Sequence, residues 1–224
     1  MLTLMTCQSN TSWGQGAIST AKWGGVRLTD VLKAAGVDDP VALTEKNGIQ
    51  KHLRMESLDG MKMKASMNME KATNPYGDVI IAYEMNDEAL LSYHGFPLQV
   101  IVPGYNAVRN VKWLSKIEIP KSKAEGAWQE VLNHKILPPS VTDAKNVDLK
   151  KMPSMTEVAV FSGITNMEMA GSPKLKPGKT IMVKTNGWAW SVGGRNIVHV
   201  DITGDGGESW QPAEIKEGGD QKFG

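Results

Sequence analysis

The stretch 94–119, HGFPLQVIVPGYNAVRNVKWLSKIEI, decides the fold that we expect for this chain. Residues 98–102 are mostly apolar and β-branched and end at Pro103-Gly104, so they predict a buried strand followed by a tight turn. Residues 117–119 alternate apolar and charged side chains and predict a second strand. The loop between them carries two cations, an amide and an indole, at Arg109, Asn110, Lys112 and Trp113. Such a loop suits a phosphate group, and the alternative is a solvated loop around a core tryptophan.

Upstream of this stretch, the pattern predicts a strand pair and a short helix. Residues 79–83 are β-branched and residues 86–88 are typical of a turn, so we expect a hairpin-like entry to the central stretch. In residues 26–36, apolar side chains recur at helical spacing, and Gly36 is positioned to end the helix. Packing is sufficient to explain that helix.

Methionines crowd the segment GMKMKASMNMEKA, residues 60–72. Thioethers bind soft metals, so a copper site is one interpretation. Methionine also fills irregular cores, and no cysteine or paired histidine adjoins the segment. We therefore favour packing.

Downstream, the composition changes and a second domain is expected. Residues 120–155 are rich in Lys, Pro, Ser and Asp, which predicts a linker over 126–155 between a domain at 1–125 and another at 156–224. After the linker, short strand candidates alternate with Gly and Pro turns, which is typical of a β-sandwich. These candidates are 157–161, 180–184, 187–191 and 197–202.

Composition excludes some classes of partner. The formal net charge is +1 and the cations are dispersed, so the chain lacks the basic surface that nucleic-acid binding requires. No apolar run approaches the ~20 residues of a membrane span, so we expect no membrane partner. The single cysteine, Cys7, excludes an internal disulfide framework.

The motif H-G-F-P at 94–97, followed by V-P-G at 102–104 and A-x-R-N-V-K-W-L at 107–114, resembles the molybdopterin-binding core of the sulfite oxidase family, which includes assimilatory nitrate reductases. The resemblance extends to Y-E-M-N at 83–86, which is closer to sulfite oxidases, and to W-A-W-S at 188–191 with G-G-R at 193–195. It implies an α+β (mixed) sulfite-oxidase-type molybdopterin domain followed by a partial immunoglobulin-like β-sandwich that mediates dimerisation.

The resemblance also implies roles for individual residues. Cys7 would be the thiolate ligand of molybdenum, since thiolates suit soft metals, and it is expected to be catalytic together with Trp13 near the substrate pocket. The residues expected to bind the cofactor are Asp59, His94, Arg109, Asn110, Val111 and Lys112. Three positions depart from the family pattern: Thr11 and Gln99 replace arginines, and Met63 replaces a tyrosine.

The function implied is oxidation of sulfite to sulfate by oxygen-atom transfer, with a molybdenum–molybdopterin cofactor. Both ends resemble cuts through a larger enzyme, so impaired activity is expected. The alternatives are a nitrate reductase-type molybdoenzyme and a non-catalytic remnant that acts as a dimerising module. We expect a homodimer with sulfite as substrate, an unknown electron acceptor and no haem domain in this chain. The sequence leaves the compartment unknown; similarity to animal relatives would imply the mitochondrial intermembrane space.

Overall fold

The computed structural model describes most of the chain between residues 18 and 157 and part of the remainder. The described residues are 2–6, 18–37, 39, 45–46, 49–50, 52–59, 63–125, 129, 135, 137, 140–157, 160–169, 182–191 and 196–216. They fall into two compact units. Unit 1 comprises residues 1–11 and 18–158, and unit 2 comprises residues 12–17 and 159–224.

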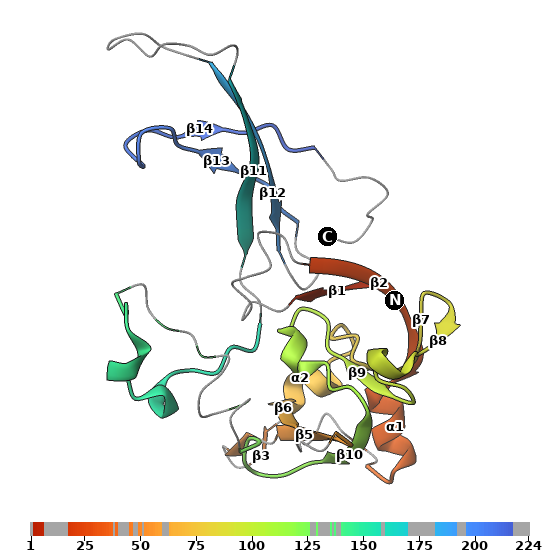
Figure 1. Cartoon of the computed structure of the whole chain (residues 1–224). Coiled ribbons are helices and arrows are strands. Elements are labelled where there is room, and N and C mark those ends of the chain that lie inside the picture. Colours follow the sequence, from red (N-terminus) through yellow and green to blue (C-terminus); the bar gives the residue numbers. More distant parts are fainter. Residues whose placement is uncertain are drawn as a thin grey trace. The chain divides into compact units, whose positions relative to one another are not determined.

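The first sheet of unit 1 is antiparallel and is built around β7 (Ile80–Met85). The order runs β1 (Leu2–Thr6), β2 (Ile18–Arg27), β7 and β8 (Glu88–Ala89), and β9 (Gln99–Ile101) also pairs with β7 (Figure 1). The predicted hairpin before the central stretch is confirmed. Asn86 and Asp87 form its turn at φ values of 55° and 65°, the left-handed region that two-residue hairpin loops require.

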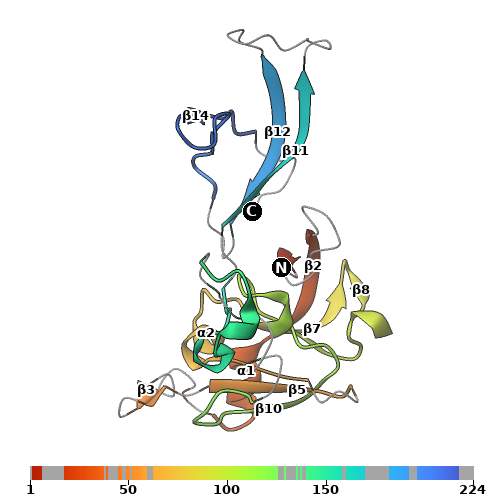
Figure 2. The ribbon, with the colours of Figure 1, turned by 60° about the vertical axis from the view of Figure 1, so that its left-hand side comes forward.

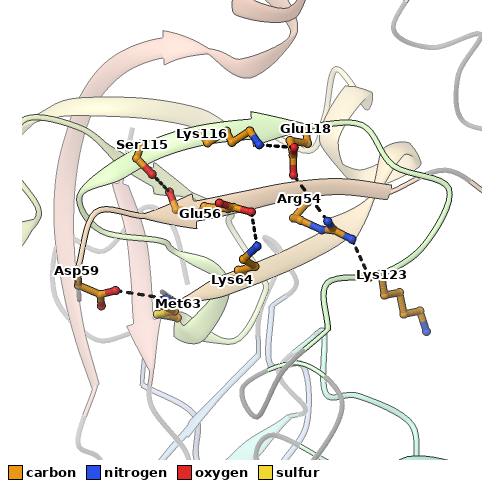
Figure 3. Close-up of polar contacts among 9 residues, drawn as sticks. All are labelled: Arg54, Glu56, Asp59, Met63, Lys64, Ser115, Lys116, Glu118 and Lys123. Carbon is orange, nitrogen blue, oxygen red and sulfur yellow. Dashed lines mark hydrogen bonds and ion pairs between the residues drawn. The ribbon is translucent and has the colours of Figure 1, made fainter. Parts of the chain in front are cut away.

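The second sheet of unit 1 separates apolar from charged side chains. Its order is β10 (Leu114–Glu118), β5 (His52–Ser57) and β6 (Lys64–Asn68), and a short pair, β3 (Glu45–Lys46) with β4 (Ile49–Gln50), stands apart from it. Because successive side chains of a strand point to opposite faces, one face is buried and the other carries ions. The charged face holds Arg54, Glu56, Lys64, Lys116 and Glu118, joined by ion pairs of 2.5–3.6 Å (Figure 3). We call these five residues the charged ladder.

The helices of unit 1 are short and cover the buried face of this sheet. Helix α1 (Leu28–Ala34) confirms the predicted helix: Leu28 and Leu32 are buried, and Gly36 ends it at φ +86°. Helix α2 (Met69–Thr73) packs into the same core (Figure 2). The 3-10 turns that the structure describes are η3 (Ser92–His94), η4 (Ala107–Arg109), η6 (Ala144–Asn146) and η7 (Leu149–Lys151).

The methionine-rich segment contributes to that core. Met67 and Met69 are fully buried beside Met55, in a cluster that also contains Leu28 and Leu53. Met63 is only half-buried, and Met61 lies outside the described residues. Packing therefore accounts for the two buried thioethers without a metal.

Unit 2 is built from strands in its described part. Strand β11 (Phe161–Met169) pairs antiparallel with β12 (Val183–Trp190), and β13 (Asp201–Ile202) pairs with β14 (Gln211–Pro212). The prediction of separate strands at 180–184 and 187–191 is wrong, because β12 runs through Gly187. A Cβ at that glycine would lie 2.5 Å from the Gly163 carbonyl oxygen, so the glycine marks a close approach of two strands and not a turn.

Among the described residues, no helix is long and apolar enough to span a membrane.

Candidate functional site

The turn that contains His94 is shaped to receive a neighbouring segment. It consists of η3 and Gly95, which adopts φ +99° and donates its N–H to the Ser92 carbonyl oxygen at 3.2 Å. A Cβ at Gly95 would lie 3.0–3.1 Å from the Cα, Cβ and Cγ atoms of Lys112. Only glycine combines this backbone conformation with so close a contact.

Lys112 and Trp113 fasten the second half of the central stretch onto this turn. The Lys112 ammonium donates to the Tyr93 carbonyl oxygen at 2.7 Å, and the Trp113 indole donates to that of Ser92 at 2.8 Å. Trp113 itself adopts φ +50°, a strained value for a bulky residue. His94, Gly95 and Lys112 therefore lie together, and we call them the polar corner.

The two polar side chains of the polar corner are partly exposed, so a ligand can reach them. Burial lowers the pKa of Lys112, because partial loss of water disfavours its charged form. An anion bound beside it would favour the charged form and oppose this shift. The His94 ring lies 4.4 Å from that of Tyr93, centroid to centroid.

The turn that carries Asp59 is hydrogen-bonded to the backbone of Trp113, next to the polar corner. The Trp113 carbonyl oxygen accepts from the Leu58 N–H at 2.9 Å, which fixes the turn that carries Asp59. One Asp59 carboxylate oxygen accepts from the Met63 N–H at 3.2 Å (Figure 3). Met63 thus contributes its backbone to this turn, at a position where the family pattern has tyrosine.

Asn110 and Val111 face inward and join the loop to β9. The Asn110 side-chain oxygen accepts from the Val102 N–H at 2.7 Å, and the Val111 carbonyl oxygen accepts from the Val100 N–H at 2.9 Å. Both residues are buried. Their buried side chains therefore hold the loop against β9 from its interior side.

Arg109 is fully buried, and its partners are neutral. Its guanidinium donates to the Gln129 side-chain oxygen and, at 3.0 Å, to the Met155 carbonyl oxygen. Within the part of the chain that the structure describes, its Nε has no partner and no carboxylate forms an ion pair with it. Burial lowers its pKa to about 10, a value at which it stays charged at neutral pH. The loop therefore encloses a positive charge that those residues do not balance.

Gln99 stands where the resemblance leads one to expect an arginine. It is fully buried, and its amide nitrogen donates to the Asn110 carbonyl oxygen at 3.3 Å. Its side-chain oxygen has no partner among the described residues. An orphaned acceptor of this kind suits an N–H donor and not a phosphate oxygen.

Of these groups, Lys112 and His94 are partly exposed, and an ammonium and an imidazole are the kinds of side chain that bind a phosphate and a nitrogen-rich ring. Arg109 and Gln99 are fully buried, so they act behind this surface. Cys7 and Trp13 lie outside the described residues, as does the segment 193–195. Among the residues that are described, no group of three or more His, Cys, Asp or Glu side chains could hold a metal ion.

Sequence reasoning missed the partners of Arg109. Gln129 is only 2% exposed, yet it lies in a stretch whose composition predicted a linker. No spacing signal identifies an isolated buried glutamine, and only its polarity beside apolar Ala127, Trp128, Val131 and Leu132 sets it apart.

Two family models match the chain. The oxidoreductase molybdopterin binding domain matches residues 1–128, and the Mo-co oxidoreductase dimerisation domain matches residues 153–223.

Individual relatives agree with these matches. The mitochondrial sulfite oxidase of Drosophila melanogaster is 40% identical over 210 residues, which cover 92% of this chain and 35% of that protein. A nitrate reductase [NAD(P)H] of Hordeum vulgare is 33% identical over 222 residues, which cover 93% of this chain and 24% of that protein. Among solved structures, the sulfane dehydrogenase SoxCD from Paracoccus pantotrophus matches with a TM-score of 0.65 and 27% identity, over 96% of this chain and 52% of that one. The chain thus spans about a third of the length of the fly relative.

Proposed function

Since this chain belongs to the sulfite oxidase family of molybdopterin oxidoreductases, we propose that it carries the cofactor-binding part of an enzyme that oxidises sulfite to sulfate. The observation that carries the proposal is the polar corner, whose Lys112 is partly exposed and belongs to the same loop as the buried guanidinium of Arg109. A phosphate at this place would accept from the Lys112 ammonium, because charge-assisted hydrogen bonds to phosphate are strong when water is excluded.

When bound, the molybdenum cofactor supplies the oxygen-atom transfer and takes up the two electrons that sulfite loses. The protein positions that group and draws the substrate anion towards it. Lys112 would donate to the phosphate, and the charge of Arg109, buried in the same loop, would add to this attraction. His94 would contact the pterin through its ring nitrogens, and Asp59, which also accepts from the Met63 N–H, would accept from pterin N–H groups.

The buried residues of the loop act through their backbones. Asn110 and Val111 have buried side chains, and their carbonyl oxygens already accept from the Gln99 amide and the Val100 N–H, so they are proposed to hold the shape of the loop beside the cofactor. Cys7 is proposed as the thiolate ligand of the metal and Trp13 as a wall of the substrate pocket. Both assignments rest on the resemblance alone.

The second unit is proposed as an immunoglobulin-like dimerisation domain, with domains at 1–125 and 156–224 and a linker at 126–155. Support comes from the family model that matches residues 153–223 and from the apolar side chains that β11 exposes, Ile164, Met167 and Met169. A two-stranded sheet with exposed apolar side chains is marginal in water by itself, so a partner surface is expected. A second copy of the chain would supply it.

The location and the substrate follow the relatives. The fly relative is mitochondrial by name, so we propose a mitochondrial location, more narrowly the intermembrane space. Nitrate is the second candidate substrate, since the barley nitrate reductase also matches, but at 33% identity against 40%. The electron acceptor is proposed to be a separate partner.

The test is to purify the chain from a host that makes the cofactor and to measure molybdenum, pterin and sulfite-dependent reduction of an artificial acceptor. We expect Lys112→Ala to lower pterin retention by roughly tenfold or more, because a charge-assisted hydrogen bond contributes about 1.5–3 kcal/mol. Lys116→Ala is the matched control, since that lysine is exposed in the charged ladder and should leave retention unchanged. A parent protein without molybdenum and pterin would refute the proposal, and faster turnover of nitrate than sulfite would favour the second candidate.

A further inference from the structure

We propose that Gln129 is a positioning residue, which fixes the guanidinium of Arg109 and thereby holds the loop 106–112 and its Lys112 in place. The consequence for cofactor binding rests on the function proposed above. The consequence for the loop does not.

Gln129 joins two segments that are far apart in the chain. Its side-chain oxygen accepts from the Arg109 guanidinium and, at 3.1 Å, from the Ser66 N–H in β6. Its own backbone is held as well, since the Ser154 hydroxyl donates to its carbonyl oxygen at 2.6 Å. One buried amide therefore connects the second sheet to the loop.

The segment that ends unit 1 supplies the other half of this arrangement. The Met155 carbonyl oxygen accepts from the Arg109 guanidinium at 3.0 Å, and the Thr156 carbonyl oxygen accepts from the Asn106 N–H at 2.8 Å. The Asn106 amide also lies 3.2 Å from the Met155 sulfur. Gln129, Met155 and Thr156 together thus hold the start of the loop, at Asn106 and Arg109, by hydrogen bonds.

From Arg109, the constraint passes along the backbone to the polar corner. Arg109 and Asn110 donate their N–H groups to the carbonyl oxygens of Asn106 and Ala107 at 2.8 and 2.9 Å, which closes the turn η4. Lys112 follows two residues after Asn110 and ends on the Tyr93 carbonyl oxygen. A guanidinium free to rotate would release this turn and the placement of Lys112 with it.

The chemistry of position 129 gives a discriminating pair of variants. Gln129→Met keeps the shape but removes the acceptor, which leaves a buried cation with one partner fewer. Gln129→Glu keeps an acceptor for both Arg109 and Ser66 and adds a charge that balances the guanidinium. A residue that merely fills space would show the opposite ranking, because a buried carboxylate is costlier than a thioether.

The experiment measures hydrogen exchange of the Arg109 and Asn110 amides in the cofactor-free chain. We expect Gln129→Met to speed their exchange by about tenfold or more while the β5 and β10 amides keep the parent's rates, and Gln129→Glu to leave all of them at or below those rates. Ser154→Ala is the matched control, since it removes a hydrogen bond from the Gln129 backbone and leaves the side chain in place. Its loop should exchange more slowly than that of Gln129→Met.

Loop exchange in Gln129→Met at the parent's rate would overturn the inference. Faster loop exchange in Gln129→Glu than in the parent would also overturn it. This second variant keeps the inference testable if Gln129→Met does not fold. The second readout is the rate at which loaded protein loses molybdopterin, which Gln129→Met should raise. If Gln129→Met shows faster loop exchange but loses molybdopterin at the parent's rate, Gln129 holds the loop and has no effect on cofactor binding. If the parent protein does not bind molybdopterin, the proposed function is refuted. The hydrogen-exchange result would then still test whether Gln129 holds the loop.

Discussion

Replacing Gly95 by alanine tests whether the polar corner depends on the close approach of two loops. Two costs are expected. The backbone at φ +99° places an alanine in a region that costs about 1–2 kcal/mol. The new methyl group would also lie 3.0–3.1 Å from Lys112, including its Cα, so the loop must move, which typically costs a further 1–3 kcal/mol. We therefore expect Gly95→Ala to lower the free energy of unfolding by roughly 2–5 kcal/mol in a denaturant titration.

Gly36→Ala is a matched control for the backbone cost. Gly36 adopts φ +86°, and a Cβ there would have no atom within 4 Å, so only the conformational penalty of about 1–2 kcal/mol applies. The difference between the two variants isolates the contact with Lys112. Equal losses of stability in the two variants would refute the reasoning. Gly36→Ala should leave the rate of chemical modification of Lys112 unchanged, and an unchanged rate in Gly95→Ala as well would also refute it.

Lys112→Met should change how stability depends on pH. The folded pKa of Lys112 lies below its ordinary value of 10.5, so between these two values the unfolded chain binds more protons and stability rises with pH. The parent's free energy of unfolding should therefore rise more steeply than the variant's as pH approaches 10.5, and parallel curves from urea titrations would contradict this. Asn86→Ala should lower stability by about 1–2 kcal/mol, because φ +55° disfavours alanine and the side chain accepts from the Lys22 N–H at 3.0 Å. Asn86→Gly keeps the turn and should lose less, as measured by thermal unfolding.

The elements that local pattern governs were predictable from the sequence. The strand around residue 81, the turn at Asn86 and the helix ended by Gly36 each carry their signal within a few residues. The meeting of His94 with Lys112 was expected only through the family motif, because spacing alone does not show that Gly95 admits a lysine against its backbone. The contacts that support the loop were not predictable.

The unpredictable part concerns contacts between distant residues. Arg109 reads as a surface cation in any window of sequence, yet it is buried against Gln129, 20 residues away, and Met155, 46 residues away. Gly187 reads as a turn, although it lies within a strand because another backbone passes close by. Neither propensity nor periodicity encodes which distant neighbour a residue will meet.

The charged ladder on the second sheet also affects the tendency of the chain to aggregate through its sheet edges. In the described part of this sheet, β6 and β10 are the outer strands, and each presents a lysine, Lys64 and Lys116. Strands with unpaired backbone groups invite pairing with other molecules, and lysines there oppose it because a second copy would bring like charges together. By this reasoning, the ladder opposes edge-to-edge pairing of β6 or β10 with a second copy of the chain. High salt, which screens these charges, would weaken that protection.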